Sequence, residues 1–169
     1  MEWLVIALLA ALMKGGKKMA DVVKPSLSRK EFAQKFLEAA KSVDWRGIPV
    51  RFAMAQSDVE SGAGTSALCK EGNNLFGLQV GSGWRGAWNG DVFTFKSGAR
   101  FRKYNSWSDS MKDWVQLMHF PLYRNALNYA VAGNLTGWAA EMKRVGYDAS
   151  TPTYAKVIEE RYRALEGVA

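Results

Sequence analysis

The sequence predicts a mainly helical α+β domain that carries one small β-hairpin lobe. Apolar residues recur at helical spacing through most of residues 28–60 and 106–165. Only residues 91–96 and 99–104 alternate in the manner of strands, around a Ser97-Gly98 turn. The chain has 169 residues, 48% of them hydrophobic, and is therefore long enough to bury one core.

The first predicted helix begins at Ser28-Arg29-Lys30-Glu31, a capping box in which the Ser and Glu side chains satisfy free amides of the first turn. Pro49 suits the first turn of the second helix, which runs to about Glu60. A short apolar helix then leads to the loop Asn73-Asn74-Leu75-Phe76-Gly77. The apolar positions that give the first helix its spacing are Phe32, Phe36, Leu37, Ala40 and Val43.

The glycine-rich residues 81–90 cannot form regular structure and precede the hairpin. After the hairpin, Ser106 is the expected N-cap of a helix that continues through Phe120 and ends at Pro121. Three more helices are predicted, the second with Asn134 as its cap, over residues 122–132, 135–145 and 153–165.

The N-terminal segment, residues 1–18, joins an apolar run at 3–13 to a lysine-rich stretch. The run is too short to span a bilayer, and Glu2 stands where a secretory signal carries positive charge. We expect a peripheral anchor for anionic membrane. The alternative is a helix that packs on the domain or on a partner. Residues 19–27 are predicted to be a linker and residues 28–169 the domain.

The net charge of +7 indicates a polyanionic partner, such as a cell wall, a membrane surface or nucleic acid. No recognition helix or zinc-finger spacing accompanies the charge, so we expect no nucleic-acid partner. Cys69 is the only cysteine, which excludes an intramolecular disulfide, and we expect it in the core. His119 is the only histidine and is expected to be structural. We therefore predict no metal and no cofactor.

Glu60 is the strongest candidate for a catalytic residue. It closes a largely apolar helix, where desolvation and the helix dipole both disfavour the ionised carboxylate. A carboxyl group with a raised pKa can act as a general acid near neutral pH, as glycosidases require. The alternative is an ordinary surface glutamate.

Several motifs in sequence order identify a family. They are the helix end Ala-Gln-x-x-x-Glu-Ser-Gly at 55–62, Asn-Asn-Leu-Phe-Gly at 73–77, Phe-Arg-x-Tyr-x-Ser at 101–106, Ser-x-x-Asp at 110–113, and Gly146-Tyr147 with Pro-Thr-Tyr-Ala at 152–155. This pattern resembles glycoside hydrolase family 73, the flagellar and autolysin type of N-acetylglucosaminidase. The resemblance covers roughly residues 30–165. It implies a lysozyme-like fold with the hairpin lobe flanking a cleft.

The resemblance also implies the reaction, which is cleavage of the β-1,4 bond between N-acetylglucosamine and N-acetylmuramic acid of peptidoglycan, with Glu60 as general acid. The family usually carries a second acid in a Val-x-Thr-x-Glu strand, but here Lys96 follows Val92 and Thr94. Asp91 is the nearest carboxylate and the candidate base; its alternative is a turn acid. The 2-acetamido group or the muramic 6-hydroxyl of the substrate could replace a base.

Three functions therefore remain open. The first is the glucosaminidase, the second a lytic transglycosylase or muramidase with one catalytic Glu, and the third a non-catalytic wall-binding or structural module. The site of action would be the bacterial cell wall, on the periplasmic or extracellular side. A single catalytic domain with a short apolar head is also what a phage endolysin or virion-associated enzyme would look like.

The resemblance implies that Tyr147 lines the cleft near Glu60; its alternative is a core aromatic. Exposed indole rings stack on the apolar faces of sugars, so the glycine-rich loop is expected to present its tryptophans to substrate, unless they fill the lobe junction. The expected substrate-binding residues are Asn74, Phe76, Trp84, Trp88 and Tyr104.

Overall fold

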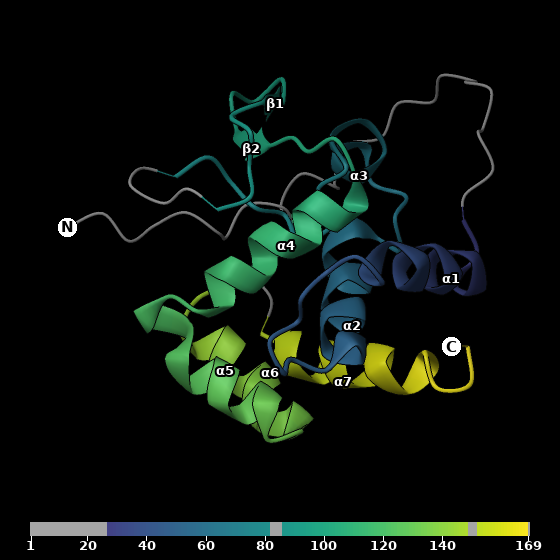
Figure 1. The fold of residues 1–169 in the computed structure, drawn as a ribbon, viewed down its shortest axis with the longest axis vertical. Helices are drawn as coiled ribbons and strands as arrows, with labels where there is room; N and C mark the ends of the chain where they lie inside the picture. The colour runs from purple at the N-terminus through teal and green to yellow at the C-terminus, as the bar shows by residue number, and fades with distance from the viewer. Residues whose placement is uncertain (1–26, 82–85, 149–151, 169) are drawn as a thin grey trace.

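The computed structural model describes residues 27–81, 86–148 and 152–168, and within them it confirms a mainly helical fold with one small antiparallel hairpin (Figure 1). Residues 1–18, predicted to be a membrane anchor, and Trp84 lie outside the described residues. No helix in the described ranges has the length and apolar character needed to cross a bilayer. The elements in chain order are α1 (Arg29–Ala40), α2 (Val50–Ser61), α3 (Ala67–Gly72), β1 (Val92–Thr94), β2 (Arg100–Arg102), α4 (Trp107–Met118), the 3₁₀ turn η2 (Pro121–Tyr123), α5 (Arg124–Val131), α6 (Leu135–Arg144) and α7 (Tyr154–Ala164).

Helix α2 is the central element, and most of its side chains are buried. Helices α1 and α7 both pack against it (Figure 1). The buried Asp58 carboxylate on α2 accepts from Arg29 Nε of α1 at 3.0 Å and lies 3.5 Å from Arg161 Nε of α7. One carboxylate therefore ties the three helices together one turn or less before Glu60.

The predicted caps are confirmed. Ser28 and Glu31 form the capping box of α1, and Ser106 and Asn134 cap α4 and α6 through Asp109 N and Gly137 N. Helix α4 ends at Met118, two residues earlier than predicted. The residue before Pro121 is extended, as a following proline requires, so the helix cannot continue. The helix expected at 122–132 begins at Arg124, because η2 occupies its first positions.

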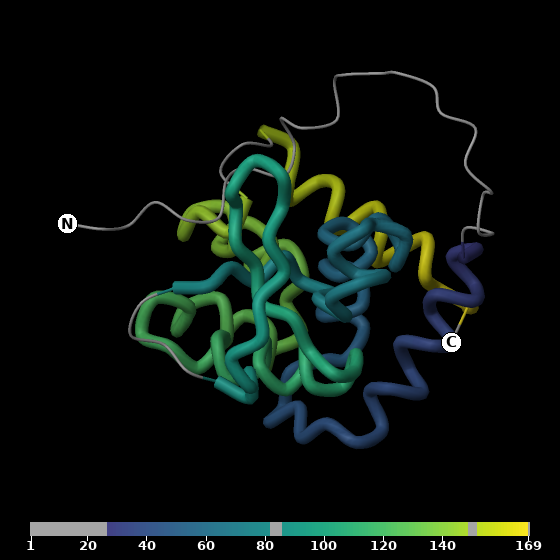
Figure 2. The backbone as a smooth tube through the Cα atoms, turned by 90° about the horizontal axis from the view of Figure 1, so that it is seen from above, coloured from purple at the N-terminus to yellow at the C-terminus, as the bar shows by residue number. Residues whose placement is uncertain are grey.

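The hairpin strands are shorter than predicted, with Phe93 opposite Phe101. The other edge of β2 is also paired, since Arg102 N donates to Leu78 O at 2.9 Å and Val80 N donates to Arg100 O at 3.2 Å. The chain that leaves the 73–77 loop thus runs beside the hairpin. Seen from above, the hairpin extends across the molecule over the helices (Figure 2). The pairing of residues 78–80 with β2 was not predicted, and it joins the 73–77 loop to the hairpin lobe.

Candidate active site

The Glu60 side chain is half-buried in the last turn of α2, and the turn that follows is shaped around it. The Ser61 hydroxyl donates to Ser57 O at 2.6 Å and accepts from Gly64 N at 2.8 Å. A Cβ on Gly64 would lie 3.2 Å from both Phe32 and Trp107, so only glycine lets the turn pack this closely on α1 and α4. The Glu-Ser-Gly motif therefore ends the helix sharply just beyond the carboxyl group.

The loop at 73–77 lies against Glu60 through Gly77. A Cβ on Gly77, whose φ is +64°, would lie 3.5 Å from Glu60 Oε2. Asn74 holds the loop in this shape. Its Nδ2 donates to Leu78 O at 2.9 Å and to Arg102 O at 2.8 Å, and its Oδ1 accepts from Phe76 N at 3.3 Å and Leu78 N at 3.0 Å.

These contacts use every donor and acceptor of the Asn74 side chain, which is buried. Phe76 is also fully buried and stacks on Trp114, with ring centroids 4.9 Å apart. Ser110 Oγ accepts from Leu75 N at 3.1 Å and joins the loop to α4. The predicted sugar contacts at Asn74 and Phe76 do not agree with this structure, in which both residues support the loop from within the core.

Burial raises the pKa of Glu60 to about 8. The Tyr154 hydroxyl donates to Glu60 Oε1 at 2.9 Å and opposes this rise, while the negative charge of Asp148 adds to it. The direction agrees with the prediction made from the helix end. A carboxyl group with this pKa is mostly protonated at neutral pH, and it can donate that proton.

Tyr147 is fully buried, and its hydroxyl donates to Phe76 O at 2.8 Å. The structure therefore places it as a core aromatic that braces the loop. Burial raises its pKa, and it lies close enough to Glu60 for the carboxylate charge to raise that pKa further, so the predicted nearness to Glu60 agrees with the structure, while its burial does not fit an exposed cleft wall. The tyrosine that contacts the acid is Tyr154, the first residue of α7. Sequence reasoning quoted Tyr154 in a motif and gave it no role, because nothing local indicates that α7 docks on the end of α2.

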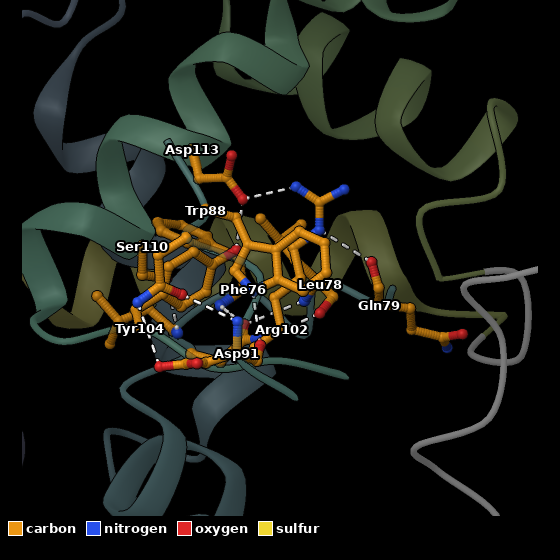
Figure 3. Close-up of polar contacts among 12 residues, drawn as sticks. Phe76, Leu78, Gln79, Trp88, Asp91, Arg102, Tyr104, Ser110 and Asp113 are labelled. Atoms are coloured by element: carbon orange, nitrogen blue, oxygen red, sulfur yellow. Dashed lines mark hydrogen bonds and ion pairs between the residues drawn. The ribbon is translucent and has the colours of Figure 1, made fainter. Parts of the chain in front are cut away.

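A buried cluster fixes the hairpin lobe to α4 (Figure 3). Arg102 Nη1 donates to Asp113 Oδ2 at 2.8 Å, and the Tyr104 hydroxyl donates to the same oxygen at 2.5 Å. Arg102 Nε donates to Gln79 O at 3.1 Å. Arg102 and Asp113 are both fully buried. The Tyr104 hydroxyl serves this cluster and is only 3% exposed as a residue, so its predicted contact with substrate does not agree with the structure.

Trp88 covers the cluster, with the Arg102 guanidinium carbon 5.0 Å from its ring centroid. Its Nε1 donates to Asp91 O at 2.6 Å. The ring is half-buried and fills the lobe junction, which was the alternative to sugar stacking. The Asp91 carboxylate is exposed and accepts from Asn89 Nδ2 at 3.2 Å within its own turn. Lys96 is exposed on the lobe.

Other reactive side chains have structural surroundings. Burial raises the pKa of the Cys69 thiol to about 11, and the residue lies in the core as predicted. His119 Nδ1 lies 2.8 Å from Val115 O. In the part of the chain that the structure describes, no three His, Cys, Asp or Glu side chains gather as a metal-binding group. The chemistry that these residues can perform is thus proton transfer at Glu60.

Known proteins resemble this chain in sequence and in fold. The chain is 32% identical to the peptidoglycan hydrolase FlgJ of Pseudomonas aeruginosa over 140 residues, covering 76% of this chain and 34% of that protein. It is 28% identical to FlgJ of Escherichia coli K12 over 177 residues, covering 96% of this chain and 54% of that protein. The chain thus spans about a third to a half of the curated relatives that it matches.

Among solved structures, a peptidoglycan hydrolase mutant from Sphingomonas sp. A1 superposes with a TM-score of 0.65 at 26% identity, covering 82% of this chain and 97% of that one. The glycoside hydrolase domain of Salmonella typhimurium FlgJ gives a TM-score of 0.61 at 26% identity, with 83% and 89% covered. The family model described as mannosyl-glycoprotein endo-β-N-acetylglucosaminidase matches residues 33–166. Since this match spans most of the sequence, the chain belongs to the glucosaminidase family, as its motifs predicted.

Proposed function

We propose that this chain is a peptidoglycan hydrolase that cleaves the β-1,4 bond between N-acetylglucosamine and N-acetylmuramic acid, with Glu60 as general acid. The observation that carries the proposal is a half-buried carboxyl group at a helix end whose pKa is raised to about 8. The names of the FlgJ relatives supply the substrate class. The bacterial cell wall is accordingly the proposed site of action.

In this mechanism Glu60 protonates the leaving glycosidic oxygen as the C–O bond breaks, and positive charge develops on the sugar ring. A second negative group on the other side of the bond would stabilise that charge or orient the attacking water. Lys96 cannot serve as that base, and the Asp91 carboxylate is held in a surface turn. Asp148 follows Tyr147 directly, and its charge acts on Glu60. Asp148 is therefore the better-supported second carboxylate.

The bond is identified by digesting purified sacculi and analysing the soluble muropeptides by mass spectrometry. We expect products that end in reducing N-acetylglucosamine. Products that end in anhydromuramic acid would instead establish the transglycosylase alternative, and reducing muramic acid would establish a muramidase. If purified protein binds sacculi but releases no muropeptide, the non-catalytic module is correct.

The two candidate carboxylates are separated by Asp148→Asn and Asp91→Asn, which remove a charge and keep the side-chain size. We expect Asp148→Asn to lower kcat about tenfold or more and to move the alkaline limb of the pH profile to lower pH, because the charge that raises the pKa of Glu60 is lost. Asp91→Asn should leave kcat within about twofold. The assay is release of soluble muropeptides between pH 5 and 9. If Asp91→Asn lowers kcat more than Asp148→Asn does, Asp91 is the second carboxylate.

A further inference from the structure

The two carboxyl oxygens of Glu60 have different surroundings, because Tyr154 donates a hydrogen bond to only one of them. The Tyr154 side chain is 1% exposed, and its hydroxyl donates to Oε1 at 2.9 Å. Oε2 faces Gly77. Burial and the nearby Glu60 carboxyl raise the pKa of Tyr154 well above its usual value, so the hydroxyl keeps its proton and remains a donor. One oxygen therefore always receives a hydrogen bond from α7.

Gln56 lies next to this pair. It precedes Glu60 by one helical turn, so both side chains project from the same face of α2. The side chain is fully buried, and neither amide atom has a hydrogen-bond partner of good geometry among the described residues. A buried amide without a partner costs free energy, and it calls for an explanation. The Gln56 amide is near enough to the Tyr154 hydroxyl to lower its pKa, as a hydrogen-bond donor would.

In a neutral carboxyl group the carbonyl oxygen is the better acceptor, and the proton sits on the other oxygen. A tyrosine that donates to Oε1 makes Oε1 the carbonyl oxygen. The proton then resides on Oε2, on the side of the loop where Gly77 adds no side chain.

We propose that Tyr154 is a positioning residue that holds the Glu60 proton on Oε2 and so selects the oxygen that meets the leaving group. This inference rests on the proposed function of Glu60. In the step itself, the C–O bond breaks with its electron pair on the glycosidic oxygen, which takes the Oε2 proton, while the attacking water bonds to the anomeric carbon and gives a proton to the second carboxylate. The carboxylate that remains keeps the hydrogen bond from Tyr154, which stabilises its charge.

The test is Tyr154→Phe, read by the ¹³C NMR titration of the Glu60 carboxyl carbon and by kcat against pH. The groups that shift the pKa of Glu60 are Tyr154 and Asp148, and the buried Tyr147 also interacts with Glu60 but keeps its proton, because burial raises its own pKa well above the usual value; Asp148 and Tyr147 are unchanged in this variant. Loss of the tyrosine hydroxyl removes a bond to the ionised form, so the Glu60 titration and the alkaline limb should both move to higher pH. We expect kcat to fall about tenfold to a hundredfold with little change in KM, because the acid loses its orientation.

The matched control is Tyr147→Phe. Tyr147 is the other buried tyrosine at the α6–α7 connection, and its hydroxyl bonds to Phe76 O instead of to the acid. This variant should lower Tm and leave the Glu60 titration where it is in the wild type. If Tyr154→Phe folds and keeps both the wild-type titration and the wild-type kcat, the positioning role is wrong.

Gln56→Met gives a second test that does not depend on the folding of Tyr154→Phe. Replacing a buried amide that has no hydrogen-bond partner of good geometry should raise Tm, and removing the polar group beside the Tyr154 hydroxyl should lower kcat severalfold. A variant with raised Tm and the wild-type kcat would show that Gln56 has no part in positioning Tyr154 against Glu60. The NMR titration needs no substrate, so it tests the hydrogen bond even if the wild-type protein releases no muropeptide and the proposed hydrolase function fails.

Discussion

Glu60→Gln is expected to abolish the release of muropeptides from sacculi while the domain stays folded. The amide has nearly the same shape as the carboxyl group but delivers no proton, and general acid catalysis contributes about 10²–10⁴-fold in rate. The measurement is muropeptide release by equal amounts of folded wild type and variant, with folding checked by circular dichroism. Activity within a fewfold of the wild type would remove Glu60 from the role of acid.

The same substitution should change stability in a way that depends on pH. The pKa of Glu60 is raised from 4.5 to about 8 in the folded state, so between these values the folded protein holds a proton that the unfolded chain has lost. The contribution of Glu60 to stability is therefore fully present below about pH 4.5 and is lost as the pH rises toward 8. Glutamine cannot ionise, so the variant should be more stable than the wild type at pH 8 and similar to it at pH 4.

Urea unfolding at pH 4 and pH 8 measures this difference. The matched control is Glu141→Gln on α6, because a hydrogen bond from Arg144 lowers the pKa of the half-buried Glu141 and its charge is favourable. The free energy of unfolding of that variant should not exceed that of the wild type at pH 8. Equal stabilities of wild type and Glu60→Gln at both pH values would mean that burial does not oppose the charge of Glu60.

Asp113→Asn is expected to cause the largest loss of stability. Arg102 is fully buried, and this variant replaces the carboxylate that lies 2.8 Å from its guanidinium with a neutral amide. Breaking a buried ion pair by removing one partner costs about 3–5 kcal/mol, a large part of the stability of a domain this size. Because Arg102 belongs to β2, the hairpin lobe should be the first part to lose its protection against amide hydrogen exchange.

The control on the same helix is Asp109→Asn, since Asp109 pairs with the half-exposed Lys112 at 3.5 Å and a surface pair contributes little. A double variant, Arg102→Met with Asp113→Leu, removes both charges and should recover much of the loss. If Asp113→Asn is as mild as Asp109→Asn, the ion pair does not hold the lobe. If the double variant is less stable than the single one, a packing defect and not the loss of the Asp113 charge explains the result.

The helices and the hairpin could be predicted because their signals are local. Capping side chains such as Ser106 and Asn134 act within a few residues, and the periodicity of apolar residues needs only one helix to be read. The structural roles of Asn74, Tyr104 and Tyr147 could not be predicted. The identity of a polar residue in a motif does not show whether its side chain contacts a sugar or is buried in the core. Their burial depends on segments distant in the sequence.

Glu60 was predicted as the candidate acid from its place at a helix end, but its hydrogen-bond partner Tyr154 was not predicted. Tyr154 lies 94 positions further along the chain, and only the packing of α7 on α2 brings the two together. The family motifs at 101–106 and 110–113 were recognised correctly. Their chemistry, a buried ion pair that joins lobe to helix, became visible only when Arg102 and Asp113 were seen in contact.

The position of Tyr154 and Arg161 on α7 has a consequence for biosynthesis. Until residues 154–161 have left the ribosome, nothing from α7 covers the end of α2, and Asp58 lacks one of its two arginine partners. A nascent chain that ends before them would carry a hydrated Glu60, whose proton is lost at neutral pH. The carboxyl group proposed as the acid therefore acquires its buried, protonated state only after translation has passed α7.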